Sequence, residues 1–77
     1  MTDLERLKIL YDELDGSDFW AVASHDEQAE IYRIRMLNEI IRIANRLGLS
    51  KLAYLAGEAK ENDDVSGVLA SLEEMFE

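Results

Sequence analysis

Four carboxylic acids fall within seven residues in the N-terminal part of this sequence, and two aromatic residues follow them directly. An acidic patch beside exposed aromatic side chains is typical of a surface that binds a basic protein, because aromatic residues contribute strongly to binding and charge selects the partner. The predicted partner-binding residues are Asp12, Glu13, Asp15, Asp18, Phe19 and Trp20. In the alternative interpretation the aromatic residues belong to the core and arginines further along the chain neutralise the acids.

The place of these acids in the chain supports the binding hypothesis. Leu4, Leu7, Tyr11 and Leu14 recur at helical spacing, and the glycine after Asp15 favours a helix end there. The C-terminal end of a helix already carries partial negative charge, so each acid placed there costs roughly 0.3 kcal/mol or more. Stability alone would not favour this arrangement.

Charge is distributed unevenly along the 77 residues, which carry a net charge of −9. Residues 1–30 contain nine acids and two bases, residues 31–50 contain one acid and four arginines, and residues 51–77 contain seven acids and two bases. Oppositely charged segments bias which helices become neighbours. A chain this acidic is also a poor partner for free nucleic acid.

The arginines of the middle segment suggest a rival function. Three of them form a stripe on one helix face, with asparagines beside them. The possible nucleic-acid contacts are Arg35, Arg42 and Arg46. Such a stripe could contact phosphates, but pairing with the acidic segments, within the chain or across an interface, is favoured.

The sequence offers little for catalysis or for a metal. There is one histidine, His25, and no cysteine, and Ala29 occupies the position four residues after His25 where a second metal ligand would lie. Residues 62–73 match an EF-hand calcium loop at several positions, but Asn62 stands where the loop usually has an acid. We expect a helix cap and an amphipathic helix there, and no enzyme activity, cofactor or metal site.

Hydropathy and capping residues predict four helices. Thr2 and Glu5 have capping-box spacing at the first helix, Ser24 and Glu27 repeat it at the second, and Gly48 predicts the end of the second. Ser50 and Asn62-Asp63-Asp64 are expected to cap the two that follow. The expected helices cover residues 2–15, 25–47, 50–60 and about 62–76.

The predicted helix over residues 25–47 has apolar residues on more than half of its circumference, whereas an ordinary surface helix has a stripe of about 100°. Three shorter helices would cover only part of it, so a second copy is the expected partner. The predicted dimer interface is Tyr32, Met36, Ile40, Ile43 and Leu47. In the alternative, Phe19, Trp20 and Val22 complete the cover within a monomer.

These observations predict one acidic all-α domain over residues 1–77, a bundle of about four helices with a long central helix, forming a homodimer. No apolar run is long enough to span a membrane, and the first five residues do not resemble a secretory signal, so we expect a cytoplasmic protein. The predicted function is stoichiometric binding of a basic partner surface by a small regulator or inhibitor, which could act as a nucleic-acid mimic. The alternative is a nucleic-acid-binding helical dimer that uses the arginine stripe.

Overall fold

The computed structural model describes residues 2–15, 27–62 and 64–76, and these residues form an all-α bundle. The described helices are α1 (Asp3–Asp15), α3 (Glu27–Leu47), α4 (Ser50–Asn62) and α5 (Ser66–Phe76). The expected all-α class is therefore confirmed. No described helix is long and apolar enough to cross a membrane.

Local capping explains where α1 begins. The Thr2 hydroxyl accepts a hydrogen bond from the Glu5 backbone N–H at 3.2 Å and donates one to a Glu5 carboxylate oxygen at 3.1 Å. The Thr2 carbonyl accepts the first helical hydrogen bond, from the backbone N–H of Arg6 at 3.0 Å. The predicted cap residue is thus confirmed, and it satisfies one of the N–H groups that a helix start leaves open.

Gly48 ends α3 as predicted. Its φ of +75° lies in the left-handed region, which glycine adopts without a steric penalty. The Leu49 N–H donates to the Ala44 carbonyl at 2.8 Å and the Gly48 N–H donates to the Asn45 carbonyl at 3.4 Å, the hydrogen-bond pattern of a Schellman cap. Leu49 is partly buried against the core, so the chain turns sharply from α3 into α4.

The junction between α4 and α5 differs from the prediction. Helix α4 continues to Asn62 and α5 begins at Ser66, because the Val65 carbonyl accepts the first bond of α5, from Leu69. The Asp64 carboxylate accepts hydrogen bonds from the Ser66 N–H at 3.0 Å and hydroxyl at 2.8 Å. Asp64 therefore caps α5 from just outside the helix.

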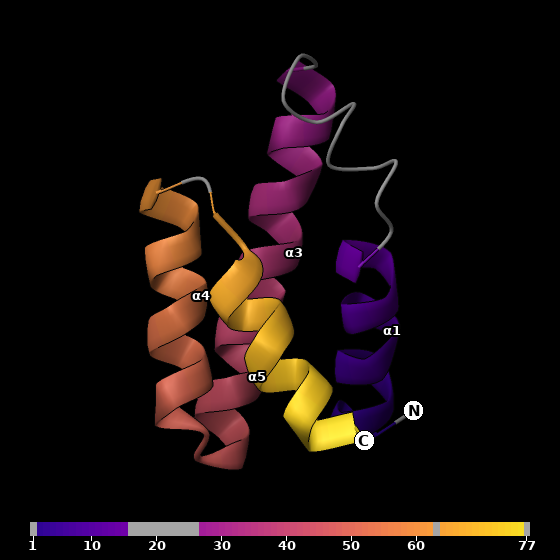
Figure 1. Cartoon of the computed structure of the whole chain (residues 1–77). Helices are drawn as coiled ribbons and strands as arrows, with labels where there is room; N and C mark the ends of the chain where they lie inside the picture. The colour runs from indigo at the N-terminus through magenta and orange to yellow at the C-terminus, as the bar shows by residue number, and fades with distance from the viewer. Residues whose placement is uncertain (1, 16–26, 63, 77) are drawn as a thin grey trace.

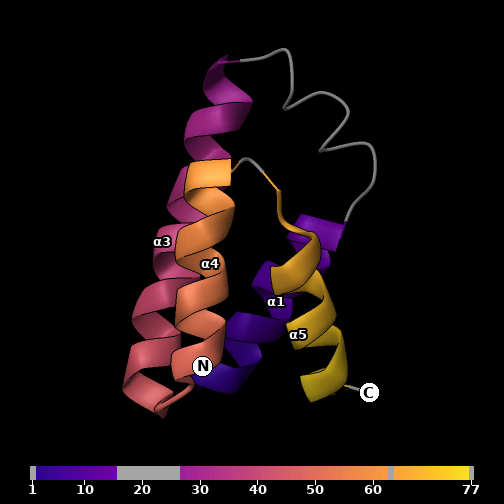
Figure 2. The same ribbon diagram turned by 60° about the vertical axis from the view of Figure 1, so that its left-hand side comes forward.

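The helices form a ring in which α3 packs against α1 and α4, and α5 closes it by packing against the same two helices. Helix α3 has 21 residues and is about 31 Å long at 1.5 Å per residue, close to the 33 Å length of the bundle. Figures 1 and 2 show its first turns standing beyond the ends of α1 and α4.

All four described helices contribute to one apolar core. Its buried members are Leu7, Leu10, Leu14, Met36, Leu37, Ile40, Ile43, Ala44, Leu52, Ala56, Ala59, Val68 and Leu72. The core face of α3 is thus covered within the same chain, with α1 and α4 as the helices that pack directly against it. Burial of these side chains leaves the opposite, polar face of α3 in solvent.

Candidate functional site

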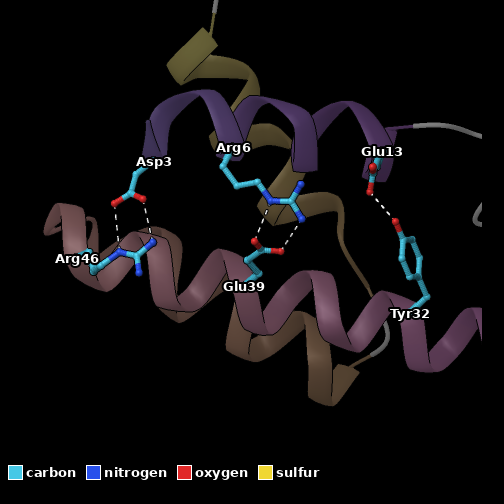
Figure 3. A network of polar contacts seen from close by, with 6 residues as sticks. All are labelled: Asp3, Arg6, Glu13, Tyr32, Glu39 and Arg46. Carbon is cyan, nitrogen blue, oxygen red and sulfur yellow. Dashed lines mark hydrogen bonds and ion pairs between the residues drawn. The ribbon is translucent and has the colours of Figure 1, made fainter. Parts of the chain in front are cut away.

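A row of three polar contacts joins α1 to α3 (Figure 3). Arg46 donates from Nε and Nη2 to the Asp3 carboxylate at 3.1 and 2.8 Å, and Arg6 donates from the same two atoms to Glu39 at 2.8 and 2.9 Å. The third contact is a hydrogen bond of 2.8 Å from the Tyr32 hydroxyl to a Glu13 carboxylate oxygen. We call these contacts the α1–α3 ladder.

The ladder shows that α1 and α3 run antiparallel. Residue numbers rise along α1 from Asp3 to Arg6 to Glu13, while their partners on α3 fall from Arg46 to Glu39 to Tyr32. Two of the three contacts are paired guanidinium–carboxylate bonds, which define orientation better than single point charges. The ladder therefore fixes the register between α1 and α3, which are not connected by a short turn.

The ladder also changes the acidity of its members. The Arg6 guanidinium bonded to Glu39 lowers the pKa of that carboxyl, and the carboxylate in turn raises the pKa of Arg6. The hydrogen bond to Glu13 raises the pKa of the Tyr32 hydroxyl, because it favours the neutral form.

The acidic end of α1, which we define as Asp12, Glu13 and Asp15, is exposed on all three side chains. Asp12 lies 3.6 Å from the ammonium of Lys8 on the same helix, and Glu13 accepts from Tyr32. Within the described residues, none of the three forms an ion pair with a cation of another helix. The other predicted partner-binding residues, Asp18, Phe19 and Trp20, lie outside the described residues, as does His25.

Apolar side chains accompany this acidic end. Ile31 is 43% exposed and Tyr32 is 45% exposed, on the part of α3 that lies beside the end of α1. An exposed aromatic ring therefore does lie beside the acids, although it comes from α3. Sequence reasoning placed Tyr32 in a dimer interface and missed its contact with Glu13, which depends on the antiparallel register.

The residues predicted to form the dimer interface separate into two groups. Met36, Ile40 and Ile43 are at most 3% exposed and lie in the chain's own core, whereas Tyr32 and Leu47 (39% exposed) are on the surface. As the chain is folded, only the second group could contact another molecule. The three short helices cover more of α3 than helix lengths alone had led us to expect.

The predicted arginine stripe is also divided by the structure. Both Arg46 nitrogens that face α1 are bonded to Asp3, but Arg35 and Arg42 are exposed and form no ion pair within the described residues. A fourth arginine of α3, Arg33, is 5% exposed and lies 3.7 Å from Glu30. Of the three stripe residues, two remain available to an anion.

Sequence analysis did not predict a hollow between α4 and α5. It has a volume of about 510 Å³ and continues into a neighbouring hollow of about 400 Å³ that shares Lys51, Ser71 and Glu74. The small residues Gly67, Ala70 and Ser71 on one face of α5 are the signal that could have indicated it. The hollow is lined by charges of both signs, from Lys51, Glu73 and Glu74. Among the described residues, no buried polar group points into the hollow.

Comparison with known proteins gives no further guide to this site. No protein-family model matches the chain, and neither a curated protein nor a solved structure resembles it at a significant level.

Proposed function

We propose that this protein acts by binding a partner protein with a basic surface, and that the acidic end of α1 is the contact region. The observation that supports this most directly is the uncompensated charge there. Three acids stand on the last turn and a half of α1, exposed, with no cation from another described helix beside them. The partner's lysines or arginines would supply the missing positive charge.

The same two helices show that this lack of cations is local. At the other end of α1, Asp3 has its arginine from α3, and Glu39 on α3 has its arginine from α1. These two arginines thus pair with acids away from the acidic end of α1, where the negative end of the helix dipole adds to the field. A field of one sign accelerates the encounter with an oppositely charged protein.

Tyr32 and Ile31 provide the apolar component that a charged surface needs for affinity. Tyrosine is frequent among the residues that dominate binding energies, and the hydroxyl of Tyr32 is held by Glu13 at 2.8 Å. A ring held in this way loses less side-chain entropy when a partner covers it. The protein would act stoichiometrically, as a regulator or inhibitor that occupies the basic site of its partner, including a site that otherwise takes phosphates.

A paired-variant experiment tests the proposal. Glu13→Gln/Asp15→Asn removes two charges while preserving shape, and Glu61→Gln/Glu73→Gln removes two exposed charges elsewhere as a control. Each form of the protein is used to capture proteins from the native host. We then purify those that bind the wild type and the control but not the first variant. Titration calorimetry should give a stoichiometric complex that weakens about tenfold or more with Glu13→Gln/Asp15→Asn.

Equal binding of a purified partner by wild type and Glu13→Gln/Asp15→Asn would exclude the acidic end of α1 as the contact region. The rival function, nucleic-acid binding through the arginine stripe, has weaker support because Arg46 is already engaged with Asp3. It would replace our proposal if a nucleic-acid mobility shift were found and Arg35→Ala/Arg42→Ala abolished it.

A further inference from the structure

Arg35 and Arg42 stand out among the cations of α3, because both are exposed and neither forms an ion pair within the described residues, although the charge of Arg42 acts on the nearby Glu39. They are seven residues apart, close to two helical turns, so they share one face and are separated by about 10.5 Å along the axis. Leu37, Ile40 and Ala44, which are buried, lie on the opposite side of the helix. The pair is therefore presented to solvent.

Helix α1 carries a matching pair of opposite charge. Glu5 and Asp12 are also seven residues apart, both are exposed, and the buried Leu7, Leu10 and Leu14 occupy the opposite side of α1. Their separation along the axis is the same, about 10.5 Å. Exposure and helical spacing thus place two carboxylates along α1 and two guanidinium groups along α3 on the outer surface formed by these two helices.

The ladder sets the relative heights of these two pairs. Arg6 lies opposite Glu39, Glu13 opposite Tyr32 and Asp3 opposite Arg46. With these contacts as reference points, Glu5 lies at the level of roughly residues 40–44 of α3, and Asp12 at the level of roughly residues 33–37. Arg42 and Arg35 fall at the middle of these two ranges.

Consider two copies related by a two-fold axis that runs parallel to the helices along this face. The rotation moves each residue to the opposite side of the axis but leaves its position along the axis unchanged. It places α1 of one copy opposite α3 of the other, so the same patch meets itself, as in a closed symmetric dimer. We propose that two copies of this chain associate in this way, with Glu5 of each copy against the partner's Arg42 and Asp12 against the partner's Arg35. The symmetry produces four intermolecular ion pairs.

This dimer differs from one built on the apolar residues of α3, which are in the chain's own core. It also differs from two α3 helices packed on each other, which would bring arginines together. The contacts are ion pairs between exposed side chains, so the association is weak and salt-dependent. It shares Asp12 with the acidic end of α1, but Glu13 and Asp15 take no part in it, so the variant Glu13→Gln/Asp15→Asn should still dimerise.

The test uses two charge-reversed variants, Glu5→Lys/Asp12→Lys and Arg35→Glu/Arg42→Glu, in sedimentation equilibrium at 0.15 M salt with circular dichroism to check folding. The wild type should dimerise, and each variant alone should weaken dimerisation about tenfold or more, since like charges then meet. An equimolar mixture should form a heterodimer, because every contact between the two variants is complementary. The control Glu61→Lys/Glu73→Lys changes the net charge as much as the first variant and should dimerise normally.

The single exchange Asp12→Arg/Arg35→Asp keeps the Thr2–Glu5 cap and the net charge of −9, and it should retain the dimer. A monomeric wild type at every concentration, variants that dimerise as well as the wild type, or a mixture that stays monomeric would each overturn the proposal. A DNA mobility shift by a monomeric wild type, lost in Arg35→Glu/Arg42→Glu, would overturn it by assigning the two arginines to phosphate.

Discussion

Helix α3 meets its two neighbours in different ways. Its contact with α4 follows from a sharp turn at Gly48, and small residues such as Ala44 and Ala56 lie buried between the helices. Its contact with α1 carries the ladder, in which two arginines and two acids pair across the helices. The short turn at Gly48 places α4 beside α3, so close packing is sufficient there. No short turn places α1 beside α3, and there the charges select the neighbour and its register.

The largest effect should come from the core that both contacts share. Ile40 is fully buried on α3, so Ile40→Ala should reduce the free energy of unfolding by about 2–5 kcal/mol, since it leaves a cavity. Urea denaturation followed by circular dichroism measures the loss. A cost similar to that of an exposed site such as Tyr54→Ala would contradict the burial of Ile40 within one chain.

Two glycines test the α3–α4 side of the comparison, one in the turn between these helices and one inside α4. Gly48 has a φ of +75°, so Gly48→Ala should destabilise the protein by about 1 kcal/mol. Gly57 is inside α4 and a Cβ there would meet no atom within 4 Å, so Gly57→Ala should stabilise it by about 0.5–1 kcal/mol. Thermal unfolding of both variants should show shifts of opposite sign, and equal signs would contradict the turn geometry.

The pH dependence of stability tests the α1 side. The pKa of Glu39 is lowered by Arg6, so its contribution to stability is present at pH values above its unfolded pKa and is lost as the pH falls through its folded pKa. Glu39→Gln should therefore lose stability at pH 7 by about 1 kcal/mol or less and show a shallower decline below pH 4.5. Urea midpoints measured from pH 7 to pH 3 compare it with Glu61→Gln, which should decline as the wild type does.

Asp64 offers a smaller test of the same kind. Its pKa is lowered by the hydrogen bonds from Ser66, so its capping contribution is also lost on acidification. Asp64→Ala should lower the melting temperature at pH 7 and have little effect on it at pH 3. Calorimetric melting at both values distinguishes this cap from a side chain without a structural role, which would give equal differences.

Features that depend on a few neighbouring residues were predictable from the sequence. The hydroxyl of Thr2 and the left-handed Gly48 act where their local spacing indicated. The start of α5 was displaced because Asn62 continues α4, and of the three candidate caps there Asp64 is seen to accept from Ser66. Local signals thus located the helices well and their ends to within a few residues.

Contacts between distant residues were less predictable. Of the arginines that the alternative paired with the acids near the end of α1, Arg46 pairs instead with Asp3 at the start of α1. The antiparallel register, which no local pattern encodes, decides this. The helical wheel likewise showed how much of α3 is apolar but not that α1, α4 and α5 would cover Ile40 and Ile43.

The most direct test of charge-selected packing is a reciprocal exchange at the middle of the ladder. Arg6→Glu and Glu39→Arg should each lower the free energy of unfolding, because like charges then face each other across α1 and α3, and the double variant should recover most of the loss. We expect a measurable coupling energy at low salt that becomes smaller at 1 M salt. Strictly additive losses in the double variant would mean that the pair does not hold α1 against α3.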